Sequence, residues 1–149
     1  MGSFTLVREV AAPPETVFDV FADHRGYTEF TPLRKVELER EGTPAPNGVG
    51  AVRKLIAAGP PIREEVTVFE RPTRFAYKML SGAPVRDHVG TIELEPRGTG
   101  TYVRYSLDST PTLPLAGRVV MGVLRVVINR MLVGGAKEAE RRAAAPAAA

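Results

Sequence analysis

Residues 7–23 read VREVAAPPETVFDVFAD. The stretch begins with an alternation of apolar and polar residues, which is typical of a strand that is exposed on one side. Two prolines follow, and then Val17, Val20 and Phe21 recur at helical spacing. Proline is favoured at the start of a helix, so the sequence predicts a strand over residues 4–11 that leads directly into a short helix.

A second short helix is expected over residues 24–30, before Pro32. From residue 33 onward the apolar pattern has a period of two, interrupted by turn clusters rich in glycine and proline. Six further strands are predicted, over residues 33–41, 50–58, 62–70, 73–80, 85–95 and 101–108. Because short turns join them, successive strands must run antiparallel.

A long helix is predicted over residues 115–142, with lysine and arginine near its end as the helix dipole prefers. One side of this helix is polar and is expected to be exposed; it comprises Arg118, Gly122, Arg125 and Asn129. The opposite side is broad and apolar. The residues expected to point toward the sheet are Leu124, Val127, Ile128 and Met131.

Together these elements predict an α+β fold with a curved seven-stranded antiparallel sheet, two short helices after the first strand, and the long C-terminal helix across the concave face. Large antiparallel sheets twist and curl, so space should remain between the sheet and the helix. The chain of 149 residues is about one domain long. We expect a single domain over residues 1–142 and a flexible alanine-rich tail over residues 143–149.

Composition excludes several classes of function. The net charge is +3 and the basic residues are scattered, so nucleic-acid binding is not expected. Arg118, Arg125 and Arg130 interrupt the apolar run at residues 115–133, which argues against a transmembrane segment. The chain has no cysteine and its N-terminus has no secretory pattern, so a cytoplasmic location is expected.

Residues 84–90 read PVRDHVG, and the adjacent Asp87 and His88 suggest a catalytic pair. Side chains alternate between the two faces of a strand, and Ile92 identifies the inner face. His88 and Arg86 share this face, whereas Asp87 is expected on the solvated one. Asp87 therefore cannot orient His88 as the acid of a catalytic triad would.

The same alternation predicts which residues line the space under the helix. Turn lengths place Met79 opposite Arg86 and Tyr77 opposite His88, with Glu64 and Val66 on the next strand. The predicted ligand-binding residues are Glu64, Val66, Tyr77, Met79, Arg86, His88, Gly90, Ile92, Tyr105, Leu124, Ile128 and Met131. A few polar groups among many apolar ones are typical of a small-molecule cavity.

Plainer interpretations stay open for the polar residues. His88 could be a core residue that is satisfied by Tyr77 or by a buried water, and Arg86 and Glu64 could simply neutralise each other at the rim. His24, between the short helices, is expected to be exposed. With no cysteine and two distant histidines, neither a metal site nor a cofactor is expected.

Several stretches together resemble the START-like (helix-grip, SRPBCC) superfamily, and within it the bacterial polyketide cyclase/dehydrase and lipid-transport branch. They span residues 3–140 and read VREVAAPPETVFDVFAD, FTPLRKVELE, NGVGAVRKL, FERPTRFAYKML, GTIELEP and TYVRYSL. Phe30 stands where the family often has tryptophan. The resemblance implies a deep apolar cavity for lipids, polyketides or hormones, but it implies no reaction.

Three functions are compatible with these observations. The favoured one is binding, transport or sensing of a hydrophobic small molecule. The second is a cyclase or dehydratase in which His88 acts as general acid or base, Tyr77 as proton donor and Arg86 as enolate stabiliser. The third is an interaction module, in which Val119, Val126 and Val133 form a dimer seam. The protein could thus be a monomer or a homodimer.

Overall fold

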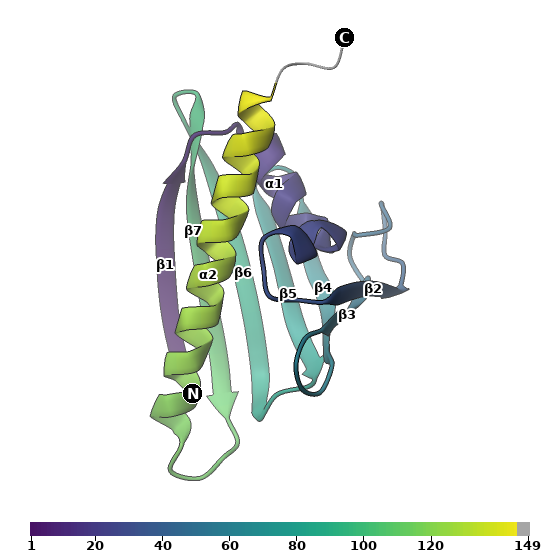
Figure 1. The fold of residues 1–149 in the computed structure, drawn as a ribbon, viewed down its shortest axis with the longest axis vertical. Helices are drawn as coiled ribbons and strands as arrows, with labels where there is room; N and C mark the ends of the chain where they lie inside the picture. The colour runs from purple at the N-terminus through teal and green to yellow at the C-terminus, as the bar shows by residue number, and fades with distance from the viewer. Residues whose placement is uncertain (146–149) are drawn as a thin grey trace.

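The computed structural model describes residues 1–145 and confirms the predicted α+β architecture (Figure 1). Each predicted strand and helix is present, with its ends shifted by a few residues. The elements are β1 (Gly2–Val10), α1 (Pro14–Ala22), the 3₁₀ helix η1 (His24–Glu29), β2 (Lys35–Arg40), β3 (Val52–Ile56), β4 (Ile62–Glu70), β5 (Arg74–Ser81), β6 (Val85–Arg97), β7 (Gly100–Pro111) and α2 (Gly117–Ala144).

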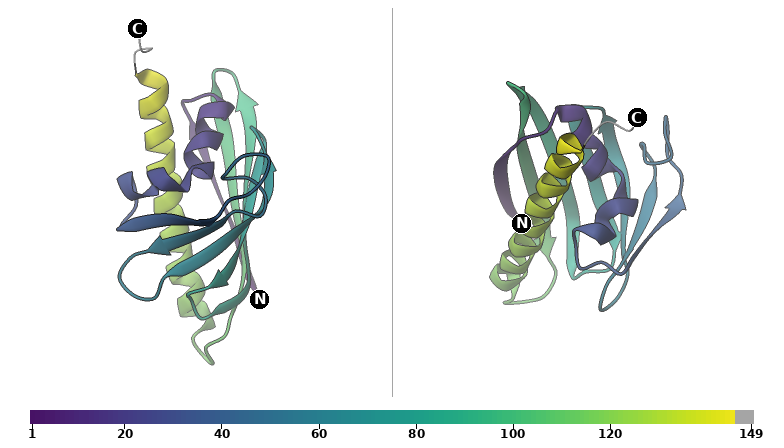
Figure 2. Two further views of the ribbon diagram at one scale, coloured as in Figure 1. Left: turned by 90° about the vertical axis from the view of Figure 1, so that its right-hand side faces the viewer. Right: turned by 45° about the horizontal axis from the view of Figure 1, so that its top comes forward.

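The seven strands form one antiparallel sheet in the order β1-β7-β6-β5-β4-β3-β2. The first strand therefore pairs with the last, where Leu6 lies opposite Tyr105 and Phe4 opposite Leu107. The sheet curves around α1 and α2, which both lie on its concave side (Figure 2). This arrangement makes the inner face of the sheet one wall of the domain core.

Helix α1 fills one end of the concave face. Its proline-initiated first turn sets the helix so that Val17, Phe18 and Phe21 are buried. The Phe18 ring packs edge-on against Phe69, with 5.1 Å between the centroids. Helix α2 approaches this cluster closely, since a Cβ at Gly135 would overlap the ring of Phe21. The glycine thus allows the close packing of α2 on α1.

Helix α2 crosses the concave face obliquely and is buried mainly in its C-terminal half. Ile128 faces inward as predicted, and Arg118, Arg125 and Asn129 are exposed as predicted. Leu124 and Met131 are partly buried. The prediction for Val127 is wrong in part, because its side chain is at the edge of the inner face and is 47% exposed.

By length and composition alone, α2 could cross a membrane: its most apolar window has a mean hydropathy of 1.6, and 22% of that window is buried. In this fold the helix packs on α1, β1 and β7, which accounts for its apolar inner side. The helix continues to Ala144, beyond the predicted end of the domain at residue 142. The predicted division into a domain and a flexible tail stays a prediction, and residues 146–149 of that tail lie outside the described residues.

Candidate functional site: a cavity between the sheet and the C-terminal helix

A cavity of about 270 Å³ lies between the curved sheet and α2. It is lined by Thr31, Pro32, Leu33, Leu55, Ala57, Ile62, Glu64, Tyr77, Met79, His88, Leu124, Val127, Ile128, Arg130 and Met131. The strands supply Glu64, Tyr77 and His88, whereas α2 contributes aliphatic and thioether side chains apart from Arg130. The segment between η1 and β2 closes the remaining side.

Seven of the twelve predicted ligand-binding residues line this cavity. They are Glu64, Tyr77, Met79, His88, Leu124, Ile128 and Met131. Four others are buried and are not part of its lining: Val66, Ile92 and Tyr105 belong to the packed core, and Gly90 lies against the Tyr77 ring. Strand alternation therefore identified the inner face correctly, but not how far the cavity extends along it.

The prediction that Arg86 faces inward is wrong. Its side chain is exposed, and that of Asp87 is exposed as predicted. The pairing of β6 with β7 shifts between Arg86 and Val89, and Asp87 has a φ of 50°. Such a bulge rotates the strand locally. Counted backward from Ile92, the alternation of faces is therefore correct as far as His88 and fails at Arg86.

The predicted pairing of β5 with β6 is wrong by two residues. Tyr77 lies opposite Gly90, not opposite His88, and Met79 does not pair with Arg86. A shift of two residues keeps every side chain on the same face, so Tyr77 and His88 still point inward. The predicted neighbours on β4 are confirmed, since Glu64 pairs with Met79 and Val66 with Tyr77.

Glu64 has a partner that the sequence interpretation missed. It forms an ion pair with Arg53 of β3, with 3.1 Å between Oε2 and Nη2, and both side chains are buried. The two residues are direct partners in the β3–β4 pairing. Burial raises the pKa of Glu64, while the Arg53 guanidinium opposes that rise. The suggested pairing of Glu64 with Arg86 is therefore wrong.

His24 of η1 is fully buried, so its predicted exposure is wrong. Neither ring nitrogen has a hydrogen-bond partner among the described residues, and the same holds for Nε and Nη1 of Arg53. Burial, with a further contribution from the Arg53 charge, lowers the pKa of His24 to about 4. The imidazole is therefore neutral at neutral pH. The position between two short helices suggested a turn on the surface, but packing against the core decided the outcome.

The remaining polar groups of the cavity are held by hydrogen bonds. The hydroxyl groups of Tyr77 and Tyr105 lie 2.6 Å apart, and Nδ1 of His88 lies 3.0 Å from Oγ of Ser109. Burial raises the pKa of the Tyr77 phenol and lowers the pKa of His88 to about 4. At neutral pH the cavity therefore presents a protonated phenol and a neutral imidazole.

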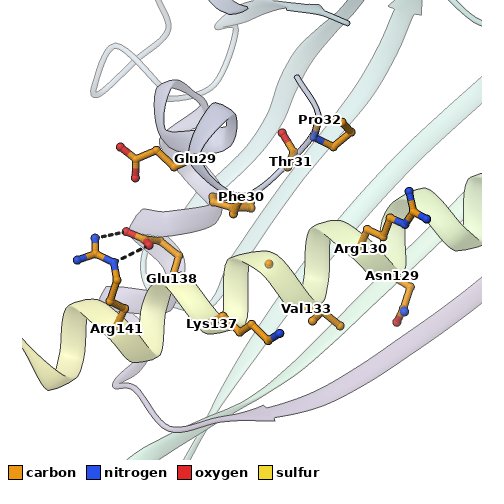
Figure 3. A pocket seen from close by; sticks show the side chains of 11 residues that line it. Glu29, Phe30, Thr31, Pro32, Asn129, Arg130, Val133, Lys137, Glu138 and Arg141 are labelled. Atoms are coloured by element: carbon orange, nitrogen blue, oxygen red, sulfur yellow. Dashed lines mark hydrogen bonds and ion pairs between the residues drawn. The ribbon is translucent and has the colours of Figure 1, made fainter. Parts of the chain in front are cut away.

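A wider groove of about 740 Å³ runs along the outside of α2 (Figure 3). Phe30 lies against the helix in this groove, with Arg130 toward one end and the Glu138–Arg141 ion pair at the other. Thr31, Pro32 and Arg130 line both the groove and the cavity. These three residues therefore mark the boundary between the two.

Sequence reasoning could have found Arg53. It alternates in phase with Leu55 on a predicted strand, and that phase places it on the inner face. A charged residue at an inner position calls for an opposite charge across the sheet, which Glu64 supplies. Thr31 and Pro32 carried no such signal, because they lie between regular elements, and Leu33 was predicted to begin a strand that in fact begins at Lys35.

No metal cluster is apparent in the part of the chain that the structure describes: no three His, Asp or Glu side chains are grouped to hold an ion. The expectation that the protein uses neither metal nor cofactor stays a prediction.

Comparison with known proteins agrees with this architecture. A START superfamily protein from Mycobacterium smegmatis has a TM-score of 0.74 at 18% identity, covering 95% of this chain and 96% of the other. Zhui aromatase/cyclase from Streptomyces sp. R1128 has a TM-score of 0.73 at 22% identity, covering 99% of both chains. Norcoclaurine synthase from Thalictrum flavum has a TM-score of 0.74 at 16% identity, covering 95% of both chains. At these identities the similarity shows the fold.

The fold is therefore that of a START-like domain with helix-grip architecture. The family model described as polyketide cyclase/dehydrase and lipid transport matches residues 1–144, and the chain belongs to this family. The comparison with curated proteins gives no match.

Proposed function

We propose that the protein binds a hydrophobic small molecule in the cavity under α2, as a carrier or sensor. The observation that carries this proposal is the cavity itself, which combines a mostly aliphatic wall with three polar side chains from the sheet, Glu64, Tyr77 and His88. Apolar cavities with a few fixed polar groups are the usual form of small-molecule sites. The family, which includes lipid-transport proteins, supports the same function.

The polar groups limit the chemistry of the ligand. Tyr77 offers a phenol that stays protonated, and His88 offers a neutral ring whose Nδ1 is already engaged by Ser109. Arg53 is neutralised by Glu64, and Arg86 is exposed. The strands therefore offer no free cation to an anionic group, and the Arg130 guanidinium comes from α2, where the cavity meets the groove. A ligand with a hydroxyl, phenol or carbonyl group on an apolar body fits best.

An enzymatic function of the cyclase or dehydratase type has less support from this arrangement. Its expected enolate stabiliser, Arg86, points away from the cavity. His88 has a pKa near 4 and is a weak base at neutral pH, whereas efficient general bases titrate close to the working pH. Binding without turnover is the simpler function for this site. The cytoplasmic location and the choice between monomer and homodimer stay predictions.

The proposal can be tested by filling the cavity. Leu124→Trp places a bulky ring in the cavity, whereas Val7→Trp places the same ring on the exposed side of β1. We expect the first variant to weaken binding of a neutral fluorescent probe, N-phenyl-1-naphthylamine, by roughly tenfold or more, because the probe loses its buried apolar contacts. The second variant should bind as the wild type does.

Native mass spectrometry of the purified wild type gives a second measurement. A copurified apolar molecule that is reduced in Leu124→Trp and retained in Val7→Trp would identify the ligand class. Equal probe affinity in the two variants, with circular dichroism showing both folded, would contradict binding in this cavity.

A further inference from the structure

The outer side of the N-terminal half of α2 carries an unpartnered apolar surface. Six side chains form it, and we call them the α2 apolar face: Leu113, Leu115, Val119, Val123, Val126 and Val127. Their exposed fractions run from 47% for Val127 to 107% for Leu115. The valines recur at intervals of three and four residues and so lie on one side of the helix. A contiguous exposed apolar set of this kind marks an interaction surface.

The segment that carries this face has only basic residues among its charged ones. From Ser109 to Lys137 the chain contains no aspartate or glutamate, and its charged residues are Arg118, Arg125, Arg130 and Lys137. Within the described residues none of the four is part of a salt bridge. The surface therefore combines apolar side chains with uncompensated positive charge.

This charge distribution decides between two possible partners. A second copy of the chain, paired along α2, would bring two helix segments together whose charged residues are all basic, and like charges oppose association. A membrane surface with anionic lipids offers acyl chains to the valines and leucines and negative headgroups to the arginines. The observed surface is complementary to the membrane and not to itself.

We propose that the α2 apolar face docks the protein on bilayers that contain anionic lipids. Helix α2 would lie in the plane of the interface, because its opposite side, with Ile128 and Leu132, belongs to the domain core. The exposed tip formed by Leu113 and Leu115 enters the headgroup region first. Helix α2 is then apolar over much of its length because one side packs on the core and another contacts lipid.

Docking in this orientation brings the cavity close to the bilayer. Val127 belongs to the α2 apolar face and also lines the cavity, and Arg130 borders both the cavity and the outer groove. Figure 2 shows η1 and the beginning of β2 on the same side of the molecule as α2. An apolar ligand could thus pass between bilayer and cavity without crossing bulk water. Docking itself does not depend on the proposed ligand binding, since it requires no occupied cavity.

Vesicle sedimentation with the full-length protein tests this inference. We expect binding to vesicles of phosphatidylcholine with phosphatidylglycerol, little binding to phosphatidylcholine alone, and weaker binding at high salt. Val123→Asp should abolish the interaction. Arg118→Gln should weaken it by roughly fivefold, the value of about one basic residue near an anionic surface. Val7→Asp is the matched control, because Val7 is 52% exposed on β1, and it should leave binding unchanged.

Several outcomes would overturn the inference. Equal binding to neutral and anionic vesicles, or an equal loss in Val7→Asp and Val123→Asp, would show that the α2 apolar face is not responsible. A stable dimer in sedimentation velocity that Val123→Asp dissociates would instead identify the face as a self-association surface. Should Val123→Asp unfold the protein, Val123→Ser makes the milder test. Probe binding in solution reports on the cavity separately, so the failure of one proposal is distinguishable from that of the other.

Discussion

Arg53 and Glu64 face each other across β3 and β4 and form a buried ion pair, with Nη2 3.1 Å from Oε2. Aromatic rings surround the cation: its guanidinium carbon lies 5.2 Å from the ring centroid of Phe75, 5.4 Å from that of Tyr27 and 5.7 Å from that of Tyr77. Such rings stabilise a cation that has left water. The pair thus places charge deep in the domain, and Glu64 at the cavity wall neutralises the Arg53 cation.

Removing one member of this pair should be strongly destabilising. Arg53→Met leaves the Glu64 carboxylate buried without a partner, and we expect the free energy of unfolding to fall by about 3–5 kcal/mol. The double variant Arg53→Met/Glu64→Leu removes both charges and should recover much of that loss. Urea denaturation followed by circular dichroism measures all three proteins. A double variant no more stable than Arg53→Met alone would show that the pair is not the cause.

Gly90 is expected to tolerate no side chain. A Cβ there would overlap the Tyr77 ring, whose hydroxyl is fixed by Tyr105. Gly90→Ala should therefore destabilise the protein by about 1–3 kcal/mol through overpacking. Gly122→Ala is the opposite case, because nothing lies near a Cβ on this exposed turn of α2. It should stabilise by up to about 1 kcal/mol. Thermal melts of both variants measure these opposite changes in stability. An unchanged melting temperature for Gly90→Ala would mean that the Tyr77 ring can move aside.

Asp87 should matter for the backbone and not for the ligand. Its φ of 50° is accessible to glycine and tolerated by aspartate or asparagine, whereas a β-branched residue is strained there. Asp87→Val should cost about 1–2 kcal/mol of stability. Asp87→Asn should leave both stability and probe affinity nearly unchanged, because this carboxylate is exposed. A large loss of affinity in folded Asp87→Asn would contradict this prediction and would mean that the Asp87 side chain reaches the cavity.

His88→Gln separates a carrier from an enzyme. Glutamine keeps a hydrogen-bonding group but takes up no proton, so ligand affinity should change by no more than about 1–2 kcal/mol. If the protein is a carrier, neither the wild type nor His88→Gln should form product. A general acid or base would instead lose on the order of a hundredfold in rate while the ligand still binds. Fluorescence titration and product analysis by mass spectrometry, with a copurified ligand or a surrogate polyketide, provide the two readouts.

Stability should decrease as the pH falls from about 6.5 to about 4. Burial lowers the pKa of His24 and His88 to about 4, whereas the unfolded chain protonates both near 6.5. The unfolded state therefore binds more protons in this window, at a cost of about 1.4 kcal/mol per pH unit for each histidine. The raised pKa of Glu64 acts in the opposite direction. Urea denaturation at several pH values should show a smaller slope for His24→Phe than for the wild type.

Wild type and His24→Phe can also be compared above pH 6.5. Between pH 7 and 8 both histidines are neutral in the folded and the unfolded chain, so the stability of wild type and His24→Phe should change little with pH. An unchanged slope for His24→Phe between pH 6.5 and 4 would mean that His24 takes up its proton in the folded state.

The fold could be predicted because local signals agree along nearly the whole chain. Prolines begin α1, apolar alternation marks each strand, and glycine–proline turns force antiparallel neighbours. Tyr77, Met79 and Glu64 were placed correctly, since alternation depends only on the pattern within one strand.

The remaining features depend on geometry that no local pattern records. A bulge at Asp87 reversed the expected direction of Arg86, and the β5–β6 turn shifted the pairing of Tyr77 by two residues. The burial of His24 follows from how η1 packs on the sheet. These are tertiary effects, which the pattern within one segment does not contain.

The two walls of the cavity differ in kind. The strands contribute the hydrogen-bonding groups of Glu64, Tyr77 and His88, whereas Leu124, Ile128 and Met131 of α2 contribute shape alone and Arg130 lies where the cavity meets the groove. Substitutions on the helix should alter the size of molecule that is accepted, and substitutions on the strands its pattern of donors and acceptors. Size selection and polar selection are then carried by separate elements, so a redesigned binder could change one property while the other is held constant.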